Sequence, residues 1–320
     1  MSTASPSAAK SRGFADVADF NDKPLSESAS KAAWIAFAVL LALLTLAYGN
    51  MLAYTSTHWS KGLYSHGWIV PLIAAYLFWI RYQPLTEVPD LERWIGVALV
   101  GACLGLRVWA AFYDYNNPDR LSFLGALAGV CLIVGGKKML FWAGPAMAFL
   151  IFMFPLPSVV ENTVLMKLQT VATIMSTWTL QLLGVSAARG GNMLMIDTLE
   201  EPLQVAEACS GLRMLTIFGA MTVALVMIIE RPWWDKLIIF LSWIPIALVS
   251  NMIRIVTTAL LLMAFGQETP WLTQIIHDWA GFAMMPIGLG LLWIELTVLS
   301  RLTVPLDEAG EYASFGAAPA

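Results

Sequence analysis

Residues 236–258 read KLIIFLSWIPIALVSNMIRIVTT, a stretch in which apolar side chains dominate from end to end. A helix needs about 20 such residues to cross the hydrocarbon core of a bilayer. Comparable stretches recur along the whole chain, so we expect an all-α polytopic integral membrane protein with about eight transmembrane helices. The predicted spans are 33–54, 66–81, 94–112, 121–136, 139–156, 210–229, 236–258 and 278–299.

The composition agrees with a membrane location. Of the 320 residues, 58% are hydrophobic and 12% are charged, whereas soluble domains carry about 25% charged residues. The 14 Trp residues suit a protein with many anchors at the membrane–water interface. No basic patch exists outside short loops, which disfavours a nucleic-acid partner and leaves the lipid bilayer as the expected surroundings.

Lys and Arg residues gather in alternate connections, which is the pattern that sets the orientation of a membrane protein. They are Lys10, Arg12, Lys23 and Lys31, then Arg81 and Arg93, Lys137 and Lys138, Arg231 and Lys236, and Arg301. The connections between these groups are nearly free of both residues. We therefore expect both termini in the cytoplasm of a bacterial cell, with the protein in the inner membrane.

The stretch 160–184 fits this pattern only if it does not cross the membrane. Were it to cross, the Lys137–Lys138 pair and Arg231 would lie on opposite sides. Polar residues also interrupt it at near-helical spacing: Glu161, Lys167, Gln169, Thr173, Thr177 and Gln181. We predict an amphipathic helix on the outer face.

The chain divides into one large domain and two tails. Residues 1–31 are rich in Ser, Ala, Lys and Asp and lack the apolar core of a signal peptide, so we predict a disordered cytoplasmic tail. Residues 32–303 form the multi-pass domain, and 304–320 form a short cytoplasmic tail. No internal repeat is visible.

Cys209 differs from the other two cysteines in its surroundings. Cys103 and Cys131 fall inside apolar runs, where core packing is expected, and three cysteines do not make a disulfide framework. Cys209 lies in the run Ala208-Cys209-Ser210-Gly211-Leu212-Arg213, where a polar loop enters an apolar helix. A helix N-terminus and nearby cations both favour the thiolate, which is the nucleophilic form.

The predicted topology brings two more residues to the same leaflet. Arg254 follows Lys236 by eighteen residues, which places it about 27 Å higher along a helix, near the outer boundary. His277 opens the last span on that side, and Asn251 precedes Arg254 by one turn. A thiol, an imidazole that exchanges protons and an Arg that holds an oxyanion together suit acyl transfer. Separately, the Arg is also compatible with a lipid anchor and the His with a helix cap.

Other polar groups compete for roles at this face. Arg213 can supply a supporting charge, and His66 is a second possible base. Glu207 can orient a base or bind a basic group of a substrate. A metal site of His66, His277 and Glu207 would lack the tight ligand spacing typical of such sites, so no metal and no cofactor is expected.

Several ordered motifs resemble those of the exosortase/archaeosortase family. They are the run 208–213, Asn251-Met252-Ile253-Arg254, His277-Asp278-Trp279-Ala280-Gly281, and Tyr64-Ser65-His66-Gly67-Trp68 followed by Pro71. The resemblance extends over about residues 35–300. It implies a membrane cysteine transpeptidase (thiol protease) in which Cys209 is the nucleophile and Arg254 and His277 complete the site.

The same resemblance implies the substrates and the setting. Exported proteins would carry a C-terminal sorting tail made of a short motif such as Pro-Glu-Pro, one membrane helix and a basic cluster. Cleavage at the periplasmic side would transfer the protein to an acceptor, in systems that often accompany exopolysaccharide production. Two other classes stay open: a multi-pass transporter, and a non-catalytic assembly subunit of a polysaccharide export system. The motif, the acceptor and the oligomeric state are not predicted.

Overall fold

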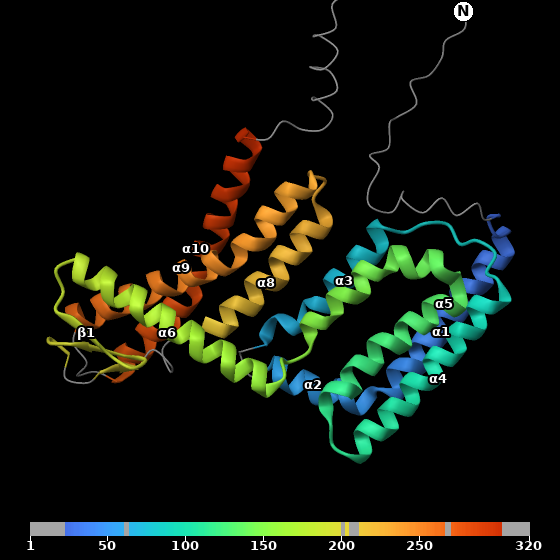
Figure 1. The fold of residues 1–320 in the computed structure, drawn as a ribbon, viewed down its shortest axis with the longest axis horizontal. Helices are drawn as coiled ribbons and strands as arrows, with labels where there is room; N and C mark the ends of the chain where they lie inside the picture. The colour runs from blue at the N-terminus through green and yellow to red at the C-terminus, as the bar shows by residue number, and fades with distance from the viewer. Residues whose placement is uncertain (1–22, 61–63, 200–201, 205–210, 266–269, 303–320) are drawn as a thin grey trace, which may run out of the picture. The chain divides into compact units, whose positions relative to one another are not determined.

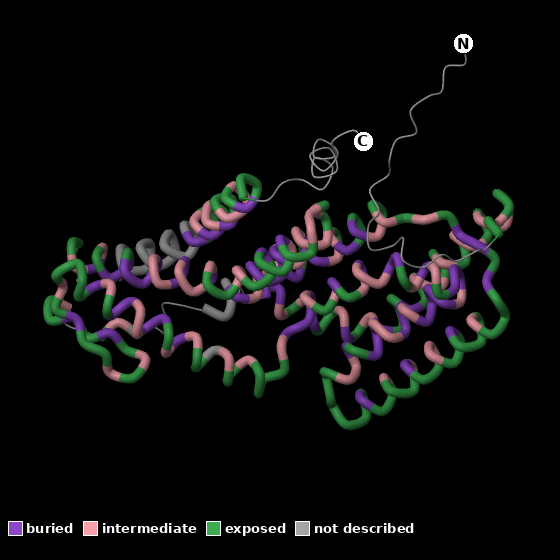
Figure 2. The backbone as a smooth tube through the Cα atoms, turned by 45° about the horizontal axis from the view of Figure 1, so that its top comes forward, coloured by how far each residue is buried: buried purple, intermediate pink, exposed green. Residues whose placement is uncertain are grey.

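The computed structural model describes residues 23–60, 64–199, 202–204, 211–265 and 270–302 (Figure 1). Most of them are helical, and the alternation of buried and exposed positions along the helices is visible in Figure 2. The chain forms two compact units. The first comprises Met1–Tyr54 and Pro71–Ile151, and the second comprises Thr55–Val70 and Phe152–Ala320.

The first unit is helical throughout its described part. Its helices are α1 (Glu27–Ala47), α3 (Val70–Ile80), α4 (Asp90–Phe112) and α5 (Asn116–Phe149), and α2 (Gly49–Trp59) continues into the second unit. The hydroxyl of Ser26 accepts a hydrogen bond from the backbone N–H of Ala29 and caps α1. The predicted tail of residues 1–31 is therefore too long, because this cap starts the helix at Glu27, before the first apolar residues of the span.

Gly136 breaks α5 into two helical segments. Its φ of 62° and ψ of −161° lie in a backbone region that is essentially restricted to glycine. The carboxylate of Glu92 then caps the second segment, since its Oε2 accepts a hydrogen bond of 2.8 Å from the backbone N–H of Lys137. This break accounts for two predicted spans, 121–136 and 139–156, within one continuous helical assignment.

Replacing Gly136 by alanine is expected to destabilise the protein by about 1–3 kcal/mol. A Cβ at this position would meet a strained φ and would lie 2.6 Å from Oε2 of Glu92. Gly144, in the second segment of α5, is a matched control because a Cβ there has no neighbour within 4 Å. Gly144→Ala should leave the stability unchanged or raise it by about 0.5–1 kcal/mol. Thermal unfolding in detergent measures both, and equal losses in the two variants would contradict the role of Gly136.

The second unit contains the longest helices and the only strands among the described residues. Its elements are η2 (Ser65–Trp68), α6 (Ser158–Leu182), β1 (Ala187–Gly190), β2 (Met193–Ile196), β3 (Leu203–Gln204), α8 (Gly211–Ile228), α9 (Trp233–Phe265) and α10 (Pro270–Leu302), and η3 (Leu150–Met153) leads into it. The strands form an antiparallel sheet in the order β1-β2-β3. The prediction of an all-α chain is thus wrong in this segment, where a two-residue Gly191–Asn192 turn favours a hairpin.

Helix α6 occupies the stretch predicted to be an outer-face amphipathic helix, but its polar side points inward. Its buried polar residues are Gln169, Thr173, Ser176 and Thr177. Its exposed side is largely apolar and includes Val160, Val171, Trp178 and Leu182, the last 88% exposed. The expectation of an outward polar stripe is wrong, because these hydroxyl and amide groups find partners in their own helix and in the adjoining hairpin. Thr173 and Thr177 donate to carbonyls one turn earlier, and Gln169 accepts from Asn192.

The structure supports a helical membrane protein with several spans. Among the described residues, five helical stretches are long and apolar enough to cross a membrane: Glu27–Ala47, Asp90–Phe112, Asn116–Met153, Trp233–Phe265 and Met284–Leu302. Two shorter apolar helices, Val70–Ile80 and Leu215–Ile228, cover two more of the predicted spans. The count of eight crossings and the cytoplasmic side of both termini stay predictions.

Candidate active site

The packing of α8 against α9 sets which residues of the two helices lie at one level. A Cβ on Gly219 would lie 2.9 Å from the ring of Trp243, and Leu215 shares a hydrophobic cluster with Ala247. Four residues earlier on α8 thus correspond to four residues later on α9, as in an antiparallel pair. The same step again brings Gly211, the first residue of α8, level with Asn251.

Helix α10 meets the same region from a second direction. Phe218 of α8 packs directly against Gly288, where a Cβ would lie 1.8 Å from the ring, and Leu215 and Met284 share one cluster. Since α8 and α10 run the same way here, the start of α8 is level with about Gly281. His277 precedes that residue by one helical turn.

Arg254 is the buried cation of this region. It is 7% exposed, and its Nη1 lies 3.7 Å from Sδ of Met284 on α10. It belongs to a strip of buried polar residues on one face of α9, namely Ser250, Asn251, Arg254 and Thr258. An Arg so far removed from solvent is not a snorkelling anchor, which would keep its guanidinium in water.

The predicted site residues are described to different extents. Arg254 and Asn251 are buried one turn apart on α9. His277 lies in α10 and Arg213 lies in the first turn of α8, but their side chains are outside the described part. Cys209 and Glu207 are outside the described residues altogether. The helices thus converge on one level, with Cys209 two residues before the start of α8 in sequence.

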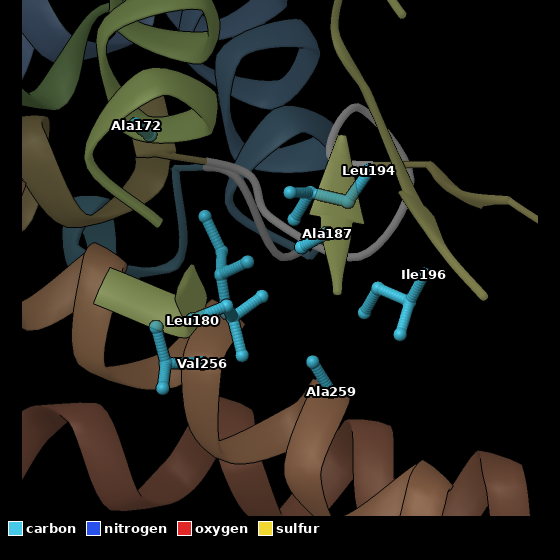
Figure 3. Packing of buried hydrophobic residues seen from close by; sticks show 8 residues of the cluster. Ala172, Leu180, Ala187, Leu194, Ile196, Val256 and Ala259 are labelled. Carbon is cyan, nitrogen blue, oxygen red and sulfur yellow. The ribbon is translucent and has the colours of Figure 1, made fainter. Parts of the chain in front are cut away.

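The sheet covers the part of α9 that follows Arg254. Leu194 and Ile196 of β2 pack with Leu180 of α6 and with Val256 and Ala259 of α9, as Figure 3 shows. The sequence did not predict this cover, although the Arg189-Gly190-Gly191-Asn192 run between two short apolar stretches is a hairpin signal. The hairpin fixes where the chain leaves α6 before it reaches Cys209.

The Tyr64–Trp68 motif has a structural task. The indole N–H of Trp59 donates to the carbonyl of Met153 at 2.7 Å, and Nε2 of His66 lies 3.1 Å from the carbonyl of Phe152. The Tyr64 hydroxyl accepts from the backbone N–H of Leu156 and lies 3.2 Å from a carboxylate oxygen of Glu161, to which it donates. These bonds tie down the connection that leads into α6.

The bonding of His66 limits its role as a base. A carbonyl only accepts, so Nε2 carries the proton in the neutral ring and Nδ1 keeps a free lone pair. That Nδ1 is buried and has no hydrogen-bond partner. His66 therefore has one nitrogen committed to the backbone and is, on this geometry, a better positioning residue than a proton shuttle.

Two further alternatives lie apart from this region. Ser242 of α9 donates to Glu295 of α10 at 2.7 Å, twelve residues and about 18 Å along α9 from Arg254. Within the described side chains, no three His, Cys, Asp or Glu residues gather as a metal site would require. Of the residues considered for a metal, the His277 and Glu207 side chains lie outside that part.

The fold and this region define a class first: a helical membrane protein with several spans and a buried Arg facing the start of a helix that follows a Cys. The comparison with known families then names the group. Residues 58–294 match the family model of the transmembrane exosortases, and the chain belongs to that family. No curated protein and no solved structure matches it.

Proposed function

We propose that this protein is a membrane-embedded cysteine transpeptidase. It cleaves C-terminal sorting tails of exported proteins at the outer face of the bacterial inner membrane and passes them to an acceptor. The observation that carries the proposal is the convergence of α8, α9 and α10 at the level of Arg254, in a chain of the transmembrane exosortase family. A link to exopolysaccharide production belongs to the same proposal.

The chemistry follows from the residue types. The Cys209 thiolate attacks the carbonyl carbon of the sorting motif, and Arg254 stabilises the oxyanion that forms. The C–N bond breaks as His277 gives its proton to the departing amine, which leaves a thioester on Cys209. The acceptor nucleophile then attacks this thioester while His277 takes its proton, and the thiolate is restored. The roles of Arg254 and His277 are exchangeable in this scheme.

The remaining residues act around this centre. Arg213 supplies a supporting charge, and Glu207 orients the imidazole or contacts the substrate. His66 positions the connection before α6 through Phe152. The substrate is a protein whose tail combines a motif, a membrane helix and a basic cluster. No cofactor takes part in the scheme.

A covalent intermediate tests the reaction. The full chain in liposomes is given a reporter protein that ends in a Pro-Glu-Pro motif, a membrane helix and a basic cluster. We expect release of the tail and an adduct between the chain and the shortened reporter, which hydroxylamine at neutral pH removes because it is a thioester. Mass spectrometry of intact protein measures both products. Tail release with no hydroxylamine-sensitive adduct would rule out the thiol mechanism, and absence of release would rule out this substrate class.

A further inference from the structure

Asn251 is a buried amide whose oxygen has no partner. Only 3% of the residue is exposed, and Oδ1 receives no hydrogen bond. It lies one turn before Arg254 on α9 and level with the first residue of α8. By contrast, Asn192 in the hairpin is fully engaged, since it accepts from Thr170 at 3.1 Å and donates to Gln169 at 3.2 Å.

Two hydroxyls beside it are in the same condition. Ser250 of α9 and Ser176 of α6 are 0% exposed, and neither Oγ has a partner. Thr173 and Thr177, the neighbours of Ser176, instead donate to carbonyls of their own helix at 2.7 Å. The unpartnered groups are thus a local feature and not the rule for hydroxyls in this unit.

The packing brings Ser176 to the level of the other two. Ala172 and Leu180 flank it by one turn on each side and pack against α9. Thr179 lies 3.4 Å from Sδ of Met252, the residue after Asn251. Nearer the start of α6, Leu168 packs with Ala247. Ser176 therefore faces the stretch of α9 that carries Ser250 and Asn251.

Buried polar groups without partners are few in native proteins because each one loses its bonds to water and gains nothing in return. A cluster of three at one level of two facing helices is a site that awaits polar groups from elsewhere. A primary amide is complementary to a peptide group, since its oxygen accepts from N–H and its NH₂ donates to C=O. Serine hydroxyls serve both sides of a main chain.

We propose that Asn251, with Ser250 and Ser176, binds the main chain of the substrate peptide next to the scissile bond. This rests on the proposed function, in which Arg254 faces the reacting carbonyl. One helical turn is about 5.4 Å, which is one to two residues of an extended peptide. In the predicted orientation Asn251 is the deeper of the two residues, so it binds the residues that follow the scissile bond, on the side of the membrane tail.

The test separates binding from stability by comparing two Asn→Leu variants of the full chain. Asn251→Leu removes a group that is unsatisfied in the free protein, so its melting temperature should stay the same or rise. Asn192→Leu removes two made hydrogen bonds, so its melting temperature should fall by at least about 2 °C. Binding is measured on the Cys209→Ala background by fluorescence anisotropy. The probe is a labelled synthetic peptide with a Pro-Glu-Pro motif, a membrane helix and a basic cluster.

Asn251→Leu should raise the Kd of this probe by about tenfold or more, and Asn192→Leu should leave it unchanged. Ser250→Ala should follow Asn251→Leu in both measurements, with a smaller change in Kd. A melting temperature lowered by Asn251→Leu as much as by Asn192→Leu would overturn the proposal, because the amide would then serve the fold. An unchanged Kd would overturn it too, while leaving the transpeptidase reaction intact. Failure of the covalent-intermediate experiment would instead overturn the proposed function.

Discussion

Cys209→Ala is expected to abolish tail release, with a loss of about 10⁴-fold or more, because no other group in the scheme can form the thioester. Cys209→Ser should also be inactive or nearly so, since a hydroxyl is a far weaker nucleophile than a thiolate at neutral pH. Release of the reporter tail is followed by its shift in mass. Wild-type processing by Cys209→Ala would refute the proposed function.

The other two cysteines provide the matched controls. Cys103 and Cys131 are both free and buried in the first unit, and Cys131 packs in a cluster with Trp142 and Met139. Cys103→Ala and Cys131→Ala should therefore retain tail release at close to the wild-type rate. A loss of activity in either one, with an intact fold, would contradict the assignment of the nucleophile to Cys209.

Arg254→Lys is expected to lower the rate of tail release by about 10²–10³-fold, the usual cost of losing one oxyanion donor. A lysine keeps the charge but presents a single ammonium in place of the planar fork of the guanidinium. Its shorter reach also loses the contact with Met284, which is 3.7 Å from Nη1 of Arg254. The rate is measured with saturating reporter, so that weaker binding does not enter it.

Arg231→Lys is the control for this change. Arg231 pairs with the buried Asp235 at 3.5 Å at the opposite end of α9, and a lysine should preserve enough of that pair to leave catalysis unchanged. Equal losses in the two variants would point to a stability effect. A non-catalytic assembly subunit, by contrast, would tolerate both Arg254→Lys and His277→Ala.

The inward polar side of α6 changes how this helix is understood. Its exposed side carries Trp178 and Leu182, which are suited to lipid, while Gln169 and Thr173 serve the interior. Periodicity alone separates the two faces of a helix but does not say which face meets the rest of the protein. In a membrane protein the usual rule of apolar inside and polar outside does not hold, because the lipid is itself apolar.

The sequence by itself determined the class of this protein and the identity of the chemical groups. Apolar runs of the length of 236–258 commit their backbone to helices, since lipid offers no partner for an open N–H or C=O. The apolar window nevertheless underestimates α9, which extends to Phe265. A helix continues past the hydrocarbon as long as its own hydrogen bonds and packing support it.

Only the tertiary structure decided which residues share one level. The register of α8, α9 and α10 depends on side-chain fit, such as Phe218 against Gly288, which no local pattern encodes. The same holds for Asn251, whose composition is ordinary and whose lack of a partner becomes visible only when its neighbours are in place. Residue types and spacing are local properties of the chain, whereas burial and hydrogen-bond satisfaction are properties of the packed whole.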